Sequence, residues 1–109
     1  MAVPSHIQLV TPWQHLAENR AEEVSLELKR ELSSAHVLYG IEARAIAGRI
    51  DRDDILFELS GFEKQLAVVH LTWSQKSEQD SKYPMTKLFA EWDDWVREKL
   101  LPDHEDYGE

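Results

Sequence analysis

The apolar positions of the N-terminal third of the chain repeat with a helical period. Between residues 13 and 32, apolar side chains recur every three or four residues, and charged side chains occupy most positions between them. This spacing is typical of an amphipathic helix that buries one face. The preceding segment TPWQ (residues 11–14) supplies an N-cap threonine, a proline suited to the first turn and a capping-box glutamine. We therefore expect a helix from about Thr11 to about Ser33.

The middle of the chain is rich in β-branched and aromatic residues and is interrupted by turn-forming segments. DRDD (residues 51–54) and SGFE (residues 60–63) have the composition of tight turns. They separate three apolar runs, so the pattern predicts strands at about 38–50, 54–60 and 64–73. Short connections of this kind join antiparallel neighbours. We expect a meander of three antiparallel strands.

The last third of the chain begins with the polar segment SQKSEQDSKYP (residues 74–84), which we interpret as a surface loop. In residues 85–100, apolar and aromatic side chains again follow a helical spacing, and Pro102 is expected to end that helix. Residues 101–109 then form an acidic tail. The predicted fold class is α+β, with the order α-β-β-β-α, in a single domain spanning residues 1–109.

The composition supports one globular domain and excludes several kinds of chemistry. The chain has 109 residues, of which 42% are hydrophobic and 30% charged, as in a folded domain of ordinary size. It has no cysteine, so disulfides, thiolate zinc sites and a cysteine nucleophile are excluded. The N-terminus lacks a secretory pattern, and the longest apolar run, LAVVHLTW, is too short to span a bilayer. We expect a cytoplasmic protein.

The formal net charge is −9, and the tail from residue 101 carries four of the acidic groups and neither lysine nor arginine. The sequence contains no basic cluster, which disfavours nucleic acid and anionic membranes as partners. An acidic surface would favour the approach of a basic protein. We therefore expect a protein partner, and a basic one fits the charge.

His70 lies in the most apolar run, VVHLTWS (residues 68–74). If Leu59 opposes Lys64 across the second turn, Asp53 opposes His70, and His70 points to the same face as Phe57. One interpretation is a semi-buried histidine that bonds to Asp53 or to the backbone. The other is a general base oriented by Asp53, with Thr72 or Ser74 as nucleophile. The sequence lacks a nucleophile-turn motif, so the first interpretation is favoured.

Trp73 and Ser74 lie where the third predicted strand meets the polar loop, and with His70 they are the candidate binding residues. A rigid aromatic side chain at such a junction is suited to anchoring a partner or ligand. The carboxylates of DRDD fit a hairpin turn better than a calcium loop, and the five histidines have no metal-ligand spacing. We expect neither a metal site nor a cofactor.

These observations favour a small acidic protein that acts by binding another macromolecule rather than an enzyme. One form of this function is an inhibitor or immunity-type partner of a basic toxin or nuclease. The alternative is a small-molecule-binding protein or hydrolase with a pocket near His70 and Trp73. Both a monomer and a homodimer are compatible with the sequence, because the second sheet face is also partly apolar.

Overall fold

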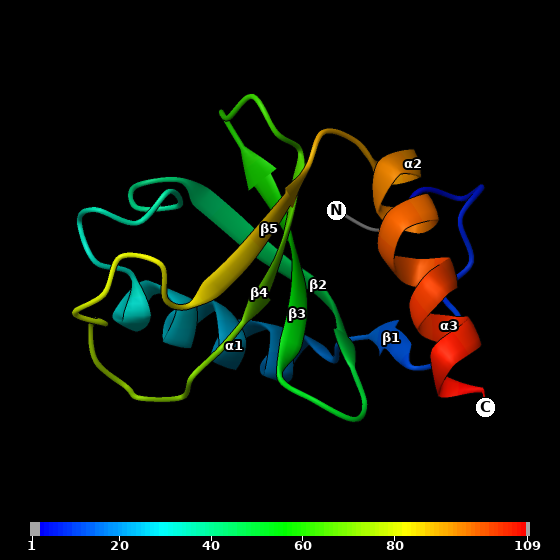
Figure 1. The fold of residues 1–109 in the computed structure, drawn as a ribbon, viewed down its shortest axis with the longest axis horizontal. Helices are drawn as coiled ribbons and strands as arrows, with labels where there is room; N and C mark the ends of the chain where they lie inside the picture. The colour runs from blue at the N-terminus through cyan, green and yellow to red at the C-terminus, as the bar shows by residue number, and fades with distance from the viewer. Residues whose placement is uncertain (1–2, 109) are drawn as a thin grey trace.

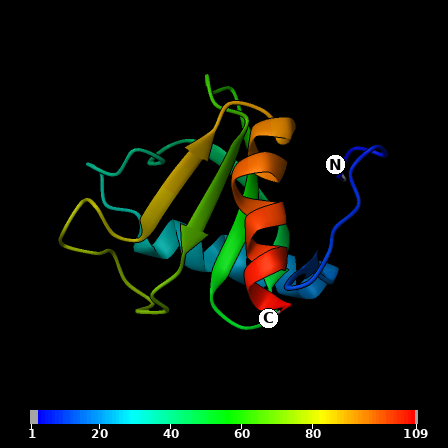
Figure 2. The same ribbon diagram turned by 45° about the vertical axis from the view of Figure 1, so that its right-hand side comes forward.

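The computed structural model describes residues 3–108, which form one antiparallel sheet with a helix on each face. Helix α1 (Glu18–Glu31) covers one face, and a second helix near the C-terminus covers the other (Figures 1 and 2). The predicted α+β class is therefore confirmed. The sheet has five strands rather than the expected three, in the order β1-β2-β3-β4-β5. Their bounds are Trp13–His15, Glu42–Arg49, Asp54–Ser60, Leu66–His70 and Met85–Phe89.

The first additional strand, β1, comes from the segment predicted to start the first helix. Trp13 pairs with Arg49 of β2, and the N–H of Ile50 donates to the carbonyl of Pro12 at 2.9 Å. The indole of Trp13 is 2% exposed. Burial of this side chain and pairing along β2 outweigh the local capping signal of residues 11–14, so the helix begins only at Glu18.

The three predicted strands are present, antiparallel and joined at the two predicted turn segments, although the second turn differs in length from the prediction. Strand β3 has the expected bounds, whereas β2 and β4 are shorter than the predicted strands. Gly61 in the second turn has φ 72°, a left-handed conformation that glycine adopts without strain. The register of β2 shifts between Ala45 and Ala47, as in a β-bulge. This shift places Ile46 and Ala47 in the same core cluster.

The second additional strand, β5, replaces the first turn of the predicted C-terminal helix. Residues 85–89 pair with β4, from Met85 opposite His70 to Phe89 opposite Leu66. Their sequence MTKLF alternates exposed and more buried positions, which is the period of a strand at a sheet edge. The predicted helix of residues 85–100 therefore starts too early, because within this range only residues after β5 are helical.

The C-terminal helix consists of α2 (Trp92–Trp95), the π-helical turn η1 (Val96–Leu100) and α3 (Leu101–Tyr107). Pro102 therefore does not end the helix, and most of the predicted acidic tail is helical. Proline lacks an N–H, and its ring would clash with the carbonyl four residues earlier in a regular α-helix. The wider turn before it, in which the N–H of Leu101 donates to the carbonyl of Val96, accommodates the ring.

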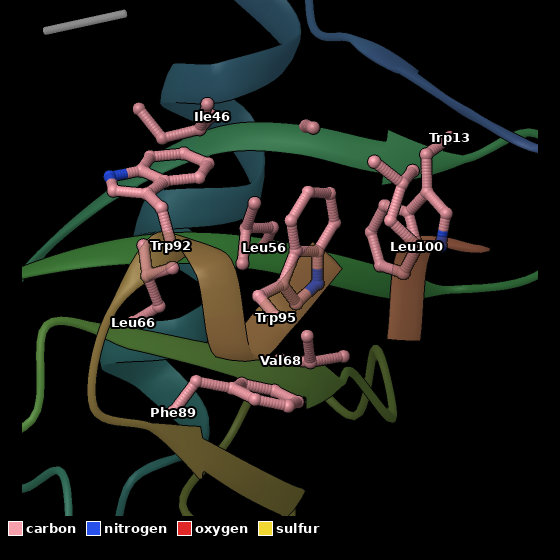
Figure 3. Packing of buried hydrophobic residues seen from close by; sticks show 10 residues of the cluster. Trp13, Ile46, Leu56, Leu66, Val68, Phe89, Trp92, Trp95 and Leu100 are labelled. Atoms are coloured by element: carbon pink, nitrogen blue, oxygen red, sulfur yellow. The ribbon is translucent and has the colours of Figure 1, made fainter. Parts of the chain in front are cut away.

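The two sheet faces carry separate apolar cores because side chains alternate along each strand. On one face, Val24 and Leu28 of α1 pack with Phe57 and Val69. On the other face, the C-terminal helix contributes Trp92, Trp95 and Leu100 to a cluster that also includes Trp13 (Figure 3). Trp95 meets Trp13 and Trp92 edge to face, with ring centroids 5.4 and 5.9 Å away. This geometry is favourable for aromatic pairs.

Asp103 fixes the C-terminal helix to the first two strands. Its carboxylate accepts a hydrogen bond from Nε1 of Trp13 at 2.9 Å and lies 3.2 Å from Nη1 of Arg49 and 3.3 Å from Nζ of Lys99. The residue is 9% exposed, so its charge is compensated by these three donors rather than by water. Within residues 3–108, no helix has the length and apolarity needed to cross a membrane.

Candidate functional site

His70 lies at the end of β4, directly opposite Asp54 and not Asp53. Its Nδ1 is 2.6 Å from Oδ1 of Asp54, and the histidine side chain is 54% exposed while that of the aspartate is 10% exposed. The expected pairing with Asp53 is therefore wrong by one residue. The Asp53 side chain is exposed, and its backbone carbonyl accepts the N–H of Leu71 at 3.1 Å.

The second turn explains this difference. The N–H of Leu59 donates to the carbonyl of Gln65, and Glu58 pairs with Leu66, so the turn is one residue longer than the predicted one. A shift of one residue reverses the faces of a strand. His70 therefore shares its face with Leu66 and Val68, on the side of the C-terminal helix, and not with Phe57.

Thr72, Trp73 and Ser74 form a second group, which lies on the α1 side of the sheet. The backbone N–H groups of Thr72 and Trp73 donate to the two carboxylate oxygens of Glu31, at 3.0 and 2.7 Å. The hydroxyl of Thr72 donates to Glu78, and that of Ser74 donates to the carbonyl of Lys76. Both hydroxyls are thus engaged within the loop, and the structure does not bring them to His70.

Glu27 and Glu31 of α1 anchor the start of the 72–84 loop, and sequence reasoning missed both roles. Each is 0% exposed. Glu27 accepts the N–H of Gln75 at 3.0 Å and a hydrogen bond from Arg30 at the same distance. The spacing of Val24, Glu27, Leu28 and Glu31 matches one helical stripe. Glu27 is one of the charged residues that lie between the apolar positions of this helix, so the sequence pattern places it on the polar face instead.

The two glutamates share a local environment that separates their pKa values. Burial, together with a hydrogen bond to Glu27 and the charge of Glu27, raises the pKa of Glu31 to about 7. Burial also acts to raise the pKa of Glu27, but hydrogen bonds from Glu31, the Gln75 N–H and Arg30 outweigh it and hold this pKa below its ordinary value. Near neutral pH the pair therefore readily holds one proton, with Glu31 as its carrier.

Trp73 and Gln75 adopt left-handed backbone conformations, with φ of 57° and 64°. Residues other than glycine rarely adopt them, and each costs about 1–2 kcal/mol. The carboxylates of Glu31 and Glu27 offset this cost because they bind the N–H groups of these same two residues. The guanidinium carbon of Arg20 lies 5.0 Å from the centre of the Trp73 ring, within the range of a cation–π contact.

The far end of the loop is held by His36, which is 6% exposed. Its Nδ1 accepts the N–H of Leu38, so its Nε2 carries the proton and donates to the carbonyl of Pro84 at 3.0 Å. Thr86 donates to the same carbonyl at 2.9 Å. The loop is therefore fixed at its beginning by α1 and at its end by the segment that follows α1.

No family model, curated protein or solved structure matches this chain. Among residues 3–108, the structure contains no group of three histidine, aspartate or glutamate side chains placed to hold a metal ion.

The contact of His36 with Pro84 brings two exposed apolar side chains to the same end of the molecule. Val37 follows His36 and is 51% exposed, and Tyr83 precedes Pro84 and is 39% exposed. Both segments lie at the left of Figure 1, beyond the end of β4 and the start of β5. We define the anchored-loop surface as residues 72–84 together with Val37.

Proposed function

We propose that this protein acts by binding another protein through the anchored-loop surface. The observation that carries the proposal is the pair of fully buried glutamates, Glu27 and Glu31, which hold the backbone of Thr72, Trp73 and Gln75. Water and ligands do not reach side chains that are 0% exposed. These carboxylates are therefore suited to shaping the loop, not to reacting with a substrate.

Fixing a loop in advance favours binding because less conformational entropy is lost when the partner arrives. Here the loop is held at both ends, by Glu31 at Thr72 and by His36 at Pro84. Loops carried on a rigid scaffold are a common location for recognition. The segment between these anchors forms no strand or helix. A role as a contact surface would explain why its shape is nevertheless held by hydrogen bonds.

The chemistry of the surface suggests the class of partner. Val37 and Tyr83 are exposed apolar side chains. In protein–protein interfaces, side chains of this kind are buried at the centre of the contact. The net charge of −9 would accelerate the approach of a positively charged protein. A basic protein with an apolar contact patch fits both features, and inhibition of a basic toxin or nuclease is one form that this binding would take.

The geometry favours binding over hydrolysis near His70 and Trp73. A hydrolase would need a nucleophile at the histidine, but the hydroxyl of Thr72 donates to Glu78. His70 also faces the C-terminal helix side, whereas Trp73 packs on the α1 side. One surface groove is lined by α1 and β2 and another by residues around Gly48, and neither of these grooves includes His70 or Trp73.

The test is a quantitative pull-down from the source organism with wild type, Y83S and the matched control Y107S. Tyr107 is 44% exposed on α3, away from the loop. We expect a saturable partner that is retained by wild type and Y107S, depleted by Y83S, and bound more weakly at high salt. Equal recovery with Y83S, or no saturable partner at low or high salt, would contradict the proposal.

A further inference from the structure

Half of strand β2 has an open edge. Strand β1 pairs only with residues 47–49 of β2, and the N–H of Leu16 donates to the carbonyl of Ile46. Within residues 3–108, no strand pairs with residues 42–45 on that side. An open edge presents backbone donors and acceptors to any strand that can approach it.

A groove with a volume of about 1140 Å³ lies between this edge and α1. Two of its lining side chains are large, apolar and exposed, namely Leu26 at 54% and Tyr39 at 56%. Residues 42–44 contain neither a proline nor a bulge, two of the features that protect an edge from pairing. Charged side chains are a third such feature, and the two charges here, Glu42 and Arg44, are of opposite sign. The edge and the groove thus form one continuous surface that is suited to an added strand.

The sequence of the edge, Glu42-Ala43-Arg44, is complementary to itself. If a second copy of β2 is placed antiparallel, with Ala43 opposite Ala43, each Glu42 lies opposite an Arg44. Opposite charges directly across two strands are favourable, and like charges are not. We propose that the open edge of β2 binds the same edge of a second copy of this chain, so that the two five-stranded sheets become one continuous sheet.

The side-chain directions within one chain are consistent with this pairing. Ala43 and Ala45 belong to the core cluster on the α1 side. Glu42 and Arg44, which alternate with them, therefore point to the other face, where both are exposed. In its own sheet Arg44 lies opposite Glu58, but it makes no ion pair in the described part of the chain. Its charge is thus available to the second copy.

The symmetry also accounts for the apolar side chains of the groove. A two-fold axis normal to the sheet keeps both copies of α1 on the same face and places them beside each other. Leu26 and Tyr39 would then be covered by the second copy. Cover of this kind contributes the apolar burial that the paired strand residues alone would not supply.

The proposal does not depend on the function of the anchored-loop surface, and it is tested with charge reversals in the full chain. In a homodimer of E42R, arginine faces arginine across the two strands, and in a homodimer of R44E, glutamate faces glutamate. In the mixed dimer of E42R with R44E, the proposed register places position 42 of each chain opposite position 44 of the other, so that an arginine faces a glutamate at both pairs. R44E also places a glutamate opposite Glu58 within its own sheet. This repulsion is present in the R44E chain whether it is alone or in the mixture. Recovery of dimers in the mixture therefore reports the contact between the two chains.

Sedimentation equilibrium of wild type, each variant and the equimolar mixture measures the association. We expect concentration-dependent dimers of wild type, association about tenfold or more weaker for each variant alone, and recovered dimers in the mixture. Hydrogen exchange of wild type should show that amides of residues 42–45 become more protected as concentration rises. A wild type that stays monomeric up to about 1 mM overturns the proposal. So do single variants that associate like wild type, or a mixture that associates no better than they do.

Discussion

The buried glutamate pair predicts how stability depends on pH, and replacing Glu31 by glutamine isolates that dependence. Glutamine has the shape of a protonated glutamate. Its carbonyl oxygen can accept one of the N–H groups of Thr72 and Trp73, and its amide can donate to Glu27 as the protonated acid does. E31Q therefore resembles the protonated form of the site at every pH.

The raised pKa of Glu31 determines the sign of the effect in the wild type. The folded protein holds this proton up to about pH 7, whereas the unfolded chain releases it near its ordinary pKa of 4.5. The stability that the proton contributes is therefore fully present below about pH 4.5, declines as the pH rises, and is lost above about pH 7. The lowered pKa of Glu27 acts in the opposite sense, but only below 4.5, outside this window.

The magnitude follows from the size of the shift. A change from 4.5 to about 7 corresponds to at most about 3–4 kcal/mol across the window. E31Q loses one acceptor for a buried N–H, which costs about 1–3 kcal/mol at any pH. We expect E31Q to be clearly less stable than wild type near pH 5 and to approach or match it near pH 8.

Urea denaturation followed by tryptophan fluorescence, at several pH values from about 5 to about 8, measures both free energies of unfolding. E22Q, which changes an exposed glutamate of the same helix, is the matched control and should run parallel to wild type. If the wild-type and E31Q curves are parallel across this window, the buried pair does not hold its proton on folding and the reasoning is refuted.

Two further comparisons test contacts that the structure places elsewhere. W13F should lower the free energy of unfolding by about 1–3 kcal/mol more than W95F does. The first change removes the indole donor to Asp103, whereas the Trp95 indole N–H has no partner within residues 3–108. Equal decreases in the free energy of unfolding, measured by urea denaturation, would contradict this. D54A should lower the melting temperature, because Asp54 is buried and bonds to His70. D53A should leave it nearly unchanged, because Asp53 is exposed. If D53A lowers the melting temperature more than D54A, the pairing of His70 with Asp53 that the sequence suggested would be favoured instead.

The sequence predicted those elements whose local pattern agrees with their tertiary environment. Strand β3 is correct to the residue, and the main part of α1 follows its apolar stripe. The two edge strands β1 and β5 were missed because their residues also fit a helical period. Trp13 and Phe89 lie within the ranges of the two predicted helices, but in the structure both are core residues of strands. Periodicity over four or five residues does not separate these alternatives.

The candidate site was only partly predictable for a related reason. The sequence indicated the junction at Trp73 and Ser74, and the structure places this junction at the anchored loop. It also suggested a carboxylate partner for His70, but the register that selects Asp54 over Asp53 depends on one residue in the second turn. Such a shift leaves no trace in the composition of the strand, because residues 66–71, apart from His70 itself, are apolar on both faces.

Glu27 and Glu31 illustrate why the remaining part of the site needed the structure. A glutamate on a helix is normally solvated, and burying its charge is costly unless donors compensate it. Here the donors are N–H groups of a loop more than 40 residues further along the chain. Those N–H groups converge on the carboxylates only because Trp73 and Gln75 are left-handed. Each feature stabilises the other, since the left-handed residues are strained and the carboxylates lose most of their donors without the loop. The shape of the anchored-loop surface therefore depends on the contacts of the loop with α1, which couples the proposed binding surface to the packing of α1 on the sheet.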